Sequence, residues 1–322
     1  MDITKVKGGR ALNKNKRSGA AAFFHELYTN RTLYIMILPA FAFVVIFNYV
    51  PLYGLQLAFK KFNFQLGIAG SPWVGFDNFI SYFKSIYFMQ TTFNTLFLNF
   101  LFIVFGVSSQ VLVAILLNEV TRRRQKIFQS AMFFPYFISW IVISFFVTAL
   151  LSERYGIVNG IITAFGGKRV PWFTMPKFWR PILTIASVWK GLGYGSVIYL
   201  AKIMGIDSEI YEAATIDGTN KFQEIRYITL PMLVPTIILL LLIAIGGVFR
   251  GDFGMIYALT GENKTLLSIT EIIDTYVYRM MKLTANHGVA AAVGLYQSIM
   301  GFALVMLSNY LVRRYDSELA LF

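Results

Sequence analysis

The chain is poor in residues that carry most enzyme chemistry, with no cysteine, two histidines and only 14% charged residues. The absence of cysteine excludes disulfide bonds, thiol catalysis and cysteine-ligated metals. His25 and His287 lie far apart in the sequence, so no histidine metal cluster is expected. A phosphate-binding loop is not recognisable, because the segment nearest to one, Gly167-Lys168-Arg169, lacks the hydroxyl residue and the upstream glycine. We therefore expect no enzyme activity, no metal and no cofactor bound by this chain.

Apolar residues are abundant instead, at 57% of the 322 residues. A soluble core of this size cannot absorb so much apolar surface, whereas each membrane-spanning helix requires a run of about 20 apolar residues. The sequence therefore predicts an all-α integral membrane protein with six transmembrane helices. The six apolar runs are Leu33–Phe59, Thr92–Leu117, Ile127–Leu151, Phe178–Ile203, Met232–Phe249 and Val289–Val312.

Basic residues are concentrated in segments that flank the apolar runs. Short loops dense in lysine and arginine remain cytoplasmic, and such clusters occur before the first run, at Arg122–Lys126 after the second, and at Arg313 and Arg314 after the last. Both termini are therefore expected in the cytoplasm. The segments expected in the cytoplasm are 121–126, 204–231 and 313–322, and those expected outside are 60–90, 152–177 and 250–288.

Residues 1–32 form a tail before the first run, and 33–322 form the predicted transmembrane domain. The tail is basic as far as Ser18 and then reads AAAFFHELY. One interpretation is a disordered tail with a short amphipathic helix on the lipid headgroups, and another is a docking element for a protein partner. We favour the first, and because the membrane surface accounts for the basic cluster, no nucleic-acid partner is expected.

A long polar break, residues 205–231, separates the fourth and fifth runs. Good helix formers over 209–217 predict a short helix, whose start Asp207 or Ser208 can cap and whose end Gly218 can form in a left-handed turn. A helix of this kind is rigid and can transmit a push to a partner.

The second half of this break is expected to form another helix from Asn220 to Tyr227. Pro231 then marks the start of the fifth span, because proline is suited to the first turn of a helix.

The order and spacing of residues in this break resemble the EAA loop of membrane subunits of ATP-binding-cassette importers. An E-A-A triplet alone also occurs in ordinary helical hairpins, but here it is followed in register by glycine and by I-T-L-P before the next span. In that family the short helix sits in a cleft of an ATP-binding subunit, where its glutamate meets a basic residue. The implied coupling residues are Glu212, Ala213, Ala214, Asp217, Gly218 and Pro231.

Further segments resemble carbohydrate-importer permeases of the maltose-transporter class, and within it the polysaccharide or lipoprotein branch. They are PWVGFDNF at 72–79, FFPYFISWIVIS at 133–144, and WKGLGYGSVIYLAKIMGI at 189–206. The resemblance implies a six-helix type I permease of the bacterial inner membrane with a cytoplasmic coupling helix. It also implies a second homologous permease as heterodimer partner, two ATP-binding subunits that hold ATP and Mg²⁺, and an extracytoplasmic solute-binding protein.

Polar and aromatic residues inside the runs are candidates for the solute path. Aromatic rings stack on the apolar faces of sugars, while amides and charges bind hydroxyl groups. Contacts between helices are the alternative explanation for each of these residues taken singly. The candidates are Trp189, Lys190, Tyr194, Tyr199, Tyr296, Gln297, Asn94 and Asn99. Several glycines in the same runs, Gly193 and Gly294 among them, favour close helix approach.

Two further questions stay open at the level of sequence. Basic residues outnumber acidic ones in the expected outer segments, which suits an acidic glycan such as alginate and equally suits an acidic binding protein or lipid headgroups. An ion-gradient-driven secondary transporter is the alternative function, although no run carries an acidic residue at its centre.

Overall fold

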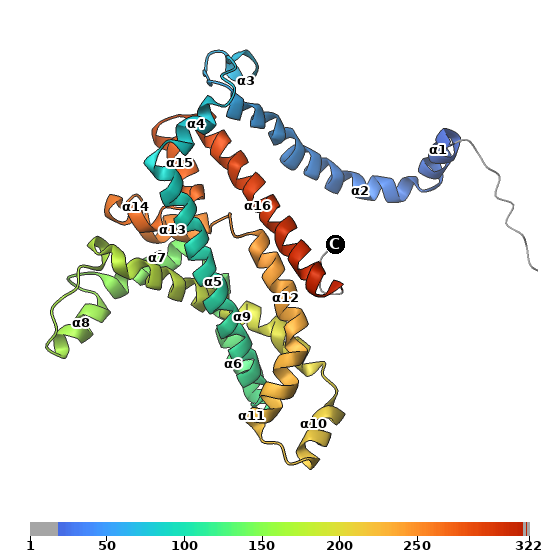
Figure 1. The fold of residues 1–322 in the computed structure, drawn as a ribbon, viewed down its shortest axis with the longest axis vertical. Coiled ribbons are helices and arrows are strands. Elements are labelled where there is room, and N and C mark those ends of the chain that lie inside the picture. Colours follow the sequence, from blue (N-terminus) through green and yellow to red (C-terminus); the bar gives the residue numbers. More distant parts are fainter. Residues whose placement is uncertain (1–18, 318–319, 321–322) are drawn as a thin grey trace, which may run out of the picture. The chain divides into compact units, whose positions relative to one another are not determined.

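The computed structural model describes residues 19–317 and residue 320 (Figure 1). These residues are almost entirely helical and contain no strand, apart from one isolated bridge between Lys60 and Trp73. The chain divides into two compact units, residues 1–54 and residues 55–322. This is a division by packing, whereas the boundary predicted after residue 32 follows the change from polar to apolar sequence.

Most of one helical stretch that is apolar enough to cross a membrane lies in the first unit. Arg31–Phe59 is a 29-residue helical stretch that continues into the second unit, and none of the side chains of α2 is buried. Residues 1–18 of the predicted tail lie outside the described residues, and a helix follows them. The elements are α1 (Gly19–Thr29), α2 (Arg31–Val44), the π-helical η1 (Val45–Tyr49) and the 3₁₀-helical η2 (Val50–Phe59).

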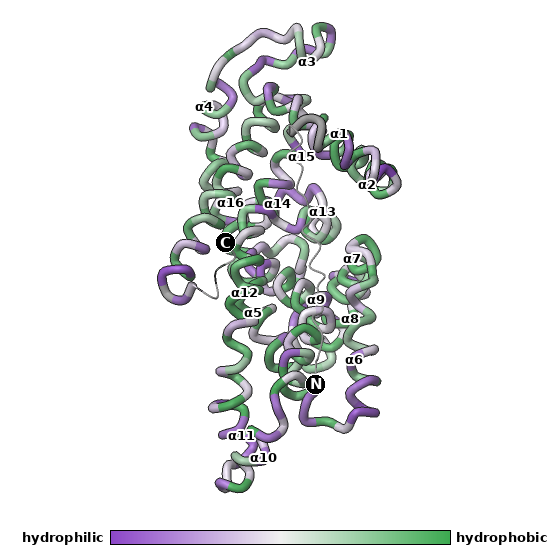
Figure 2. Tube along the Cα trace, turned by 90° about the vertical axis from the view of Figure 1, so that its right-hand side faces the viewer, coloured by the Kyte–Doolittle hydropathy of each residue, from purple (hydrophilic) through white to green (hydrophobic). Residues whose placement is uncertain are grey.

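The second unit is built on long helices whose apolar middle parts contrast with polar ends (Figure 2). The long helices are α5 (Ile86–Asn118), α6 (Arg122–Phe137), α7 (Trp140–Leu151), α9 (Trp179–Met204), α12 (Leu230–Gly246) and α16 (His287–Tyr315). The shorter elements are α3 (Gly67–Gly70), α4 (Asp77–Phe83), α8 (Ile157–Ala164), η3 (Trp172–Thr174), η4 (Pro176–Phe178), α10 (Ser208–Ile216), α11 (Lys221–Glu224), the π-helical η5 (Ile225–Thr229), α13 (Phe253–Thr260), α14 (Lys264–Thr270) and α15 (Ile273–Leu283).

Four helical stretches among the described residues are long and apolar enough to span a membrane. They are Arg31–Phe59, Ile86–Asn118, Lys221–Gly246 and His287–Arg314, which contain the predicted first, second, fifth and sixth runs in whole or in large part. The fourth run corresponds to α9, which has 26 residues but carries Arg180, Lys190 and Lys202 and is less apolar.

The prediction of one continuous span over Ile127–Leu151 is wrong. The structure has two helices there, α6 and α7, that meet at an angle of 99°. Ile138 and Ser139 are extended between them, and the Ser139 hydroxyl accepts a hydrogen bond from the Val142 amide at the start of α7. The basic residues after the second run are also not a loop, because α6 begins at Arg122.

The fifth span begins earlier than predicted. One continuous helix runs from Lys221 to Gly246, so Pro231 lies within it and the helix from Asn220 does not end at Tyr227. Proline lacks an N–H and its ring crowds the carbonyl four residues earlier. The π-helical turn of η5 just before Pro231 widens the helix at this place and lets it continue.

The core of the second unit lies along α5 and α9, which pack against each other over much of their length. One apolar cluster joins these helices to α7, α13 and α14 through Trp179 and Met255, and another joins them to α12 through Tyr199 and Leu233. Gly193 permits close contact between α9 and α6, because a Cβ there would overlap the carbonyl of Met132. The same expectation is wrong for Gly294, whose Cβ position has no heavy atom within 4 Å.

Candidate coupling site and solute path

Local hydrogen bonds fix both ends of α10 in the polar break. The Asp207 side chain accepts a hydrogen bond of 3.0 Å from the Glu209 amide and so caps the start of the helix. At the other end, Gly218 has φ of 81°, and its amide donates to the Thr215 carbonyl at 3.1 Å. The Thr219 amide donates to the Ala214 carbonyl at 3.1 Å, which completes a Schellman motif.

A second set of contacts joins α10 to the base of α12. The Tyr211 hydroxyl lies 2.9 Å from the Thr229 hydroxyl, and Thr229 is buried within η5. Asn220 and Gln223 form a capping box that starts α11, and Lys221 pairs with the buried carboxylate of Glu224 at 2.7 Å. A short connection of defined hydrogen bonds therefore joins α10 to the long helix.

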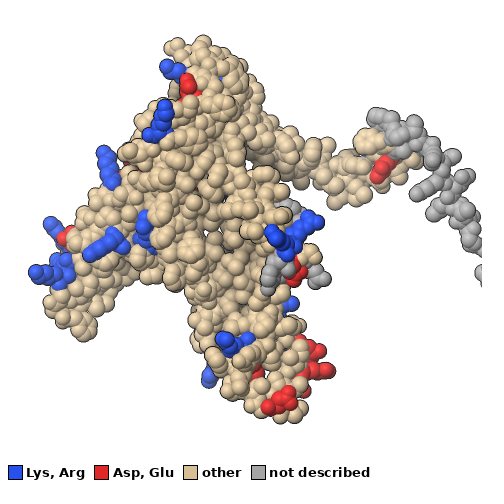
Figure 3. Space-filling model, in the orientation of Figure 1, with Lys and Arg blue, Asp and Glu red and all other residues tan. Residues whose placement is uncertain are grey.

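The outer surface of α10 is exposed in the part of the chain that the structure describes. Glu212, Ala213, Asp217 and Gly218 are exposed, and Ala214 is partly buried. Glu212 forms no ion pair with any residue that the structure describes. Acidic side chains gather at this end of the second unit (Figure 3).

Large apolar side chains accompany the acidic ones. Ile216 at the end of α10 is 86% exposed, and Phe222 in α11 is 72% exposed. A surface that combines fixed negative charge with exposed apolar side chains is suited to a basic partner with apolar pockets. Pro231, the remaining predicted coupling residue, lies on α12 and is not part of α10.

The polar candidates of the solute path hydrogen-bond to backbone carbonyls at helix ends. Lys190 donates to three carbonyls where α6 ends, those of Pro135, Tyr136 and Ile138, at 3.3, 2.7 and 2.5 Å. Carbonyls at a helix end have no partner within the helix, and an unpaired carbonyl inside a membrane is costly. Lys190 therefore stabilises the break between α6 and α7.

The three amide candidates have comparable contacts. Asn94 donates to the carbonyls of Ser268 and Glu271, and Asn99 donates to those of Val248 and Arg250. Gln297 donates to the Phe249 carbonyl at 2.6 Å and to the Asp274 carboxylate at 3.0 Å. The carbonyls of 248, 249 and 250 follow the end of α12, so Asn99 and Gln297 hold the chain where it leaves this helix, whereas Asn94 holds the end of α14.

The aromatic candidates do not form a single site. Tyr199 is fully buried, and Tyr296 packs within a cluster of rings that includes Tyr82 and Phe83. Tyr194 is 49% exposed and stacks on Tyr136 with ring centroids 4.7 Å apart. Trp189 is 44% exposed and, together with residues of α7, lines an apolar cavity. Tyr194 and Trp189 thus remain candidates that a solute could reach.

Two charged contacts near these residues were not foreseen as parts of the site. The Arg180 guanidinium donates to the Asn94 side chain at 3.0 Å, and the Trp140 indole donates to the Asp252 carboxylate at 2.8 Å. The only signal in the sequence was the presence of charges beside apolar runs. Their partners come from distant segments and could not be read from local spacing.

Comparisons with known proteins agree with this architecture. A family model described as "Binding-protein-dependent transport system inner membrane component" matches residues 110–317. Protein LplB of Bacillus subtilis (strain 168) is 33% identical over 91% of this chain and 92% of its own length. The polygalacturonan/rhamnogalacturonan transport system permease protein YteP of the same organism is 34% identical over 91% of each chain.

Solved structures are similar over nearly the whole chain. A crystal structure of a bacterial ABC transporter involved in the import of the acidic polysaccharide alginate contains a chain with a TM-score of 0.84 and 34% identity, covering 92% of this chain and 99% of that one. A second structure shows a bacterial alginate ABC transporter in complex with an alginate pentasaccharide-bound periplasmic protein, and its matching chain has a TM-score of 0.82 at 34% identity.

Proposed function

Because the chain belongs to the family of binding-protein-dependent transport system inner membrane components, we propose that it is the permease subunit of an ATP-driven carbohydrate importer. It accepts an oligosaccharide or polysaccharide from an extracytoplasmic solute-binding protein and moves it across the inner membrane. A separate chain hydrolyses ATP with Mg²⁺, and this chain couples that reaction to movement of the solute.

The capped and exposed helix α10 is the observation that carries this proposal. Its ends are fixed by Asp207 and Gly218, and Tyr211 joins it to the base of a membrane-length helix. Its carboxylate at Glu212 forms no ion pair with the residues that the structure describes. A rigid helix that is anchored on one side and open on the other is suited to receive a push from an ATP-binding subunit. The acidic and apolar surface of α10 and α11 supports a partner with basic and apolar groups.

Six spans with both termini in the cytoplasm are part of the proposal. The four apolar stretches supply four of them, α9 supplies a fifth, and the bent pair α6–α7 supplies the sixth. This topology places α10 in the cytoplasm and the segment between α12 and α16 outside.

A second homologous permease subunit is the proposed partner within the membrane. An apolar cavity of about 610 Å³ lies among α6, α7, α8 and α9 and is lined by Phe146, Ile185 and Trp189, among others. Lipid tails or an apolar helix of another subunit would fill this cavity, since few polar groups line it. The described residues supply one set of spans and one coupling helix, so a second set must come from another subunit, and a heterodimer is proposed because permeases of the resembled branch normally pair with a homologous subunit.

An acidic glycan is the proposed substrate class. Two similar proteins carry names or descriptions of acidic polysaccharides, namely polygalacturonan and alginate. The excess of basic residues in the proposed outer segments supports attraction of such chains.

Substitution of Glu212 tests the coupling role. In the transporter reconstituted with its partner subunits, Glu212→Ala should lower uptake of the oligosaccharide at least tenfold and lower the ATP hydrolysis that a loaded binding protein stimulates. Membrane insertion should be unchanged, because Glu212 is exposed and forms no ion pair with a described residue. Glu209→Ala removes another exposed carboxylate from the same helix and should have a much smaller effect.

Full activity of Glu212→Ala would remove this residue from the coupling site. A second measurement tests the energy source, because uptake should stop when the phosphate-binding loop of the ATPase subunit is inactivated. Uptake that continues on an ion gradient would instead support a secondary transporter.

A further inference from the structure

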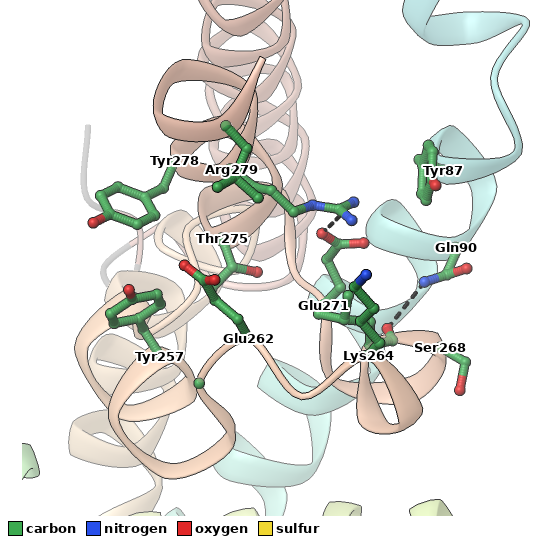
Figure 4. Close-up of a pocket in the computed structure, with 13 residues that line it drawn as sticks. Tyr87, Gln90, Tyr257, Glu262, Lys264, Ser268, Glu271, Thr275, Tyr278 and Arg279 are labelled. Carbon is green, nitrogen blue, oxygen red and sulfur yellow. Dashed lines mark hydrogen bonds and ion pairs between the residues drawn. The ribbon is translucent and has the colours of Figure 1, made fainter. Parts of the chain in front are cut away.

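A cavity of about 560 Å³ opens between the start of α5 and the short helices α13, α14 and α15 (Figure 4). Its lining includes none of the residues of the coupling site or of the predicted solute path. Helices α13–α15 follow the far end of α12, whereas α10 and α11 precede its near end. In the proposed topology, the cavity therefore lies on the opposite side of the membrane from the coupling helix.

Tyrosine rings form two facing walls of this cavity. Figure 4 shows Tyr257 and Tyr278 on one side and Tyr87 on the other, with Arg279 and Glu271 between them. Tyr257 and Tyr278 have ring centroids 5.1 Å apart, and Tyr257 also stacks on Phe253 at 5.3 Å. These contacts hold the rings in place before a ligand arrives, and such rings offer flat surfaces to the CH faces of a sugar.

Charged groups at the cavity are paired except for one. Arg279 contacts Glu271 at 2.6 Å, and Lys282 beside the cavity contacts Glu262 at 3.0 Å. Lys264, which also lines the cavity, is exposed and forms no ion pair with any described residue. One positive charge is thus left uncompensated.

Polar groups that are already fixed lie beside this charge. The Arg279 guanidinium is 5.0 Å from the centre of the Tyr87 ring, and Gln90 is held by a hydrogen bond to the Leu267 carbonyl. A ligand that matches this cavity has an apolar ring face, several hydroxyl groups and one negative charge. A neutral sugar would leave Lys264 unpaired, and a strongly anionic ligand would meet the carboxylates of Glu262 and Glu271.

We propose that this cavity binds one uronate residue of an acidic oligosaccharide, with the sugar ring against the tyrosines and its carboxylate at Lys264. The inference rests on the proposed function and adds a capture site outside the solute path. Such a site holds the glycan at the outer face of the permease before or during transfer from the binding protein.

Direct binding to the reconstituted transporter in lipid nanodiscs, without binding protein, tests this site by calorimetry. The two probes are a uronate trisaccharide and its carboxyl-reduced, neutral counterpart. The wild-type complex should prefer the uronate, and Lys264→Gln should lower that preference at least fivefold with little effect on the neutral sugar. Tyr278→Leu should weaken the binding of both probes.

Matched controls lie in the third proposed outer segment, residues 152–177, which contributes no residue to the lining of this cavity. Lys168 and Tyr155 are exposed residues away from this cavity, so Lys168→Gln and Tyr155→Leu should leave the binding of both probes unchanged. The complete transporter is used throughout, and a normal rate of basal ATP hydrolysis in each variant shows that the complex is intact.

Three outcomes would overturn the inference. The first is equal binding of the two probes to the wild type, and the second is an unchanged preference in Lys264→Gln. The third comes from a parallel measurement of binding-protein docking, in which the cavity variants weaken docking while both probes bind normally. ATP-dependent uptake by the wild type is measured separately. If uptake is present and the cavity variants bind normally, the capture site is wrong and the proposed importer function stands.

Discussion

Gly218 adopts a backbone conformation that other residues rarely accept. Its φ is 81°, and no heavy atom lies within 4 Å of the position that a Cβ would take. A larger side chain therefore meets conformational strain and no steric overlap. We expect Gly218→Val to destabilise the end of α10 by about 1–2 kcal/mol, and hydrogen exchange of the α10 amides would measure the loss.

The matched variant at this position is Gly218→Asn, because asparagine accepts the left-handed conformation more readily. Hydrogen exchange of the α10 amides should be nearly as slow in this variant as in the wild type. Transport activity should rank the wild type, the asparagine variant and the valine variant in the same order as the protection of these amides. Equal exchange in the valine and asparagine variants would contradict the role assigned to the backbone of Gly218.

Glu271 makes the segment from α14 to α15 sensitive to pH. Burial raises the pKa of Glu271 to about 7, although the nearby Arg279 acts in the opposite direction. The folded state therefore holds the proton more tightly than the unfolded state does. The local free energy of unfolding should be highest below about pH 4.5 and should fall by roughly 3 kcal/mol as pH rises to about 7.

Hydrogen exchange of α14 and α15 over this pH range measures that change. Glu271→Gln should remove most of the pH dependence, whereas Glu262→Gln, which changes an exposed carboxylate of the same cavity, should keep it. A wild-type segment that is equally stable at pH 5 and pH 8 would show that Arg279 compensates for burial fully.

Single residues differ in how far the sequence predicts their role. The capping by Asp207 and the left-handed turn at Gly218 depend on neighbours in the chain, so local chemistry was sufficient to place them. The partners of Lys190 and Asn94 lie more than fifty residues away in sequence. Their residue types indicated only that each needs a polar partner, and the same need can be met by a solute or by a helix end.

The contact between Tyr211 and Thr229 joins two elements, α10 and η5, through one hydrogen bond of 2.9 Å. We expect Tyr211→Phe and Thr229→Val each to weaken this connection by about 0.5–1.5 kcal/mol. The number of solute molecules transported per ATP hydrolysed should fall, because the ATPase subunit can still hydrolyse ATP while less of the motion of α10 reaches α12.

A double-mutant cycle checks that the two side chains act together. The double variant should be little worse than either single one, and Tyr227→Phe, at an exposed tyrosine of η5, should behave as wild type. Strictly additive losses would mean that the two hydroxyl groups contribute separately.

The break between α6 and α7 shows why hydropathy located the apolar segments more reliably than their geometry. Both halves of Ile127–Leu151 are apolar, so the whole segment has the length and hydropathy that are typical of one span. The 99° bend depends on Ser139 as the cap of α7 and on Lys190, which supplies hydrogen bonds to the end of α6 from another helix. This second contribution has no trace in the local sequence.

At the scale of the whole molecule, the proposed topology predicts where each polar segment lies. A reporter fused after Arg124 should be cytoplasmic, and one fused at Gly167 should be external, because α6 through α9 must return the chain to the side of α10. Paired reporters active on each side of the membrane would measure this. The reverse result at both positions would place α10 outside and exclude it from coupling.

The π-helical turn at Ile225–Thr229 affects how the side chains of α11 are oriented around the helix axis relative to those of α12. A π turn is equivalent to one extra residue in an α-helix, and each residue of an α-helix advances the direction of its side chains by about 100°. Removal of one residue between Ile225 and Thr229 would convert the π turn to α-helix and keep α11, and with it the point where α10 is anchored, in phase with the membrane part of this helix, whereas removal of a second residue would rotate α11 by about 100°. The direction in which Glu212 is presented to a partner should therefore tolerate the loss of one residue within the π turn, whereas the loss of two would turn Glu212 away without changing any residue of α10.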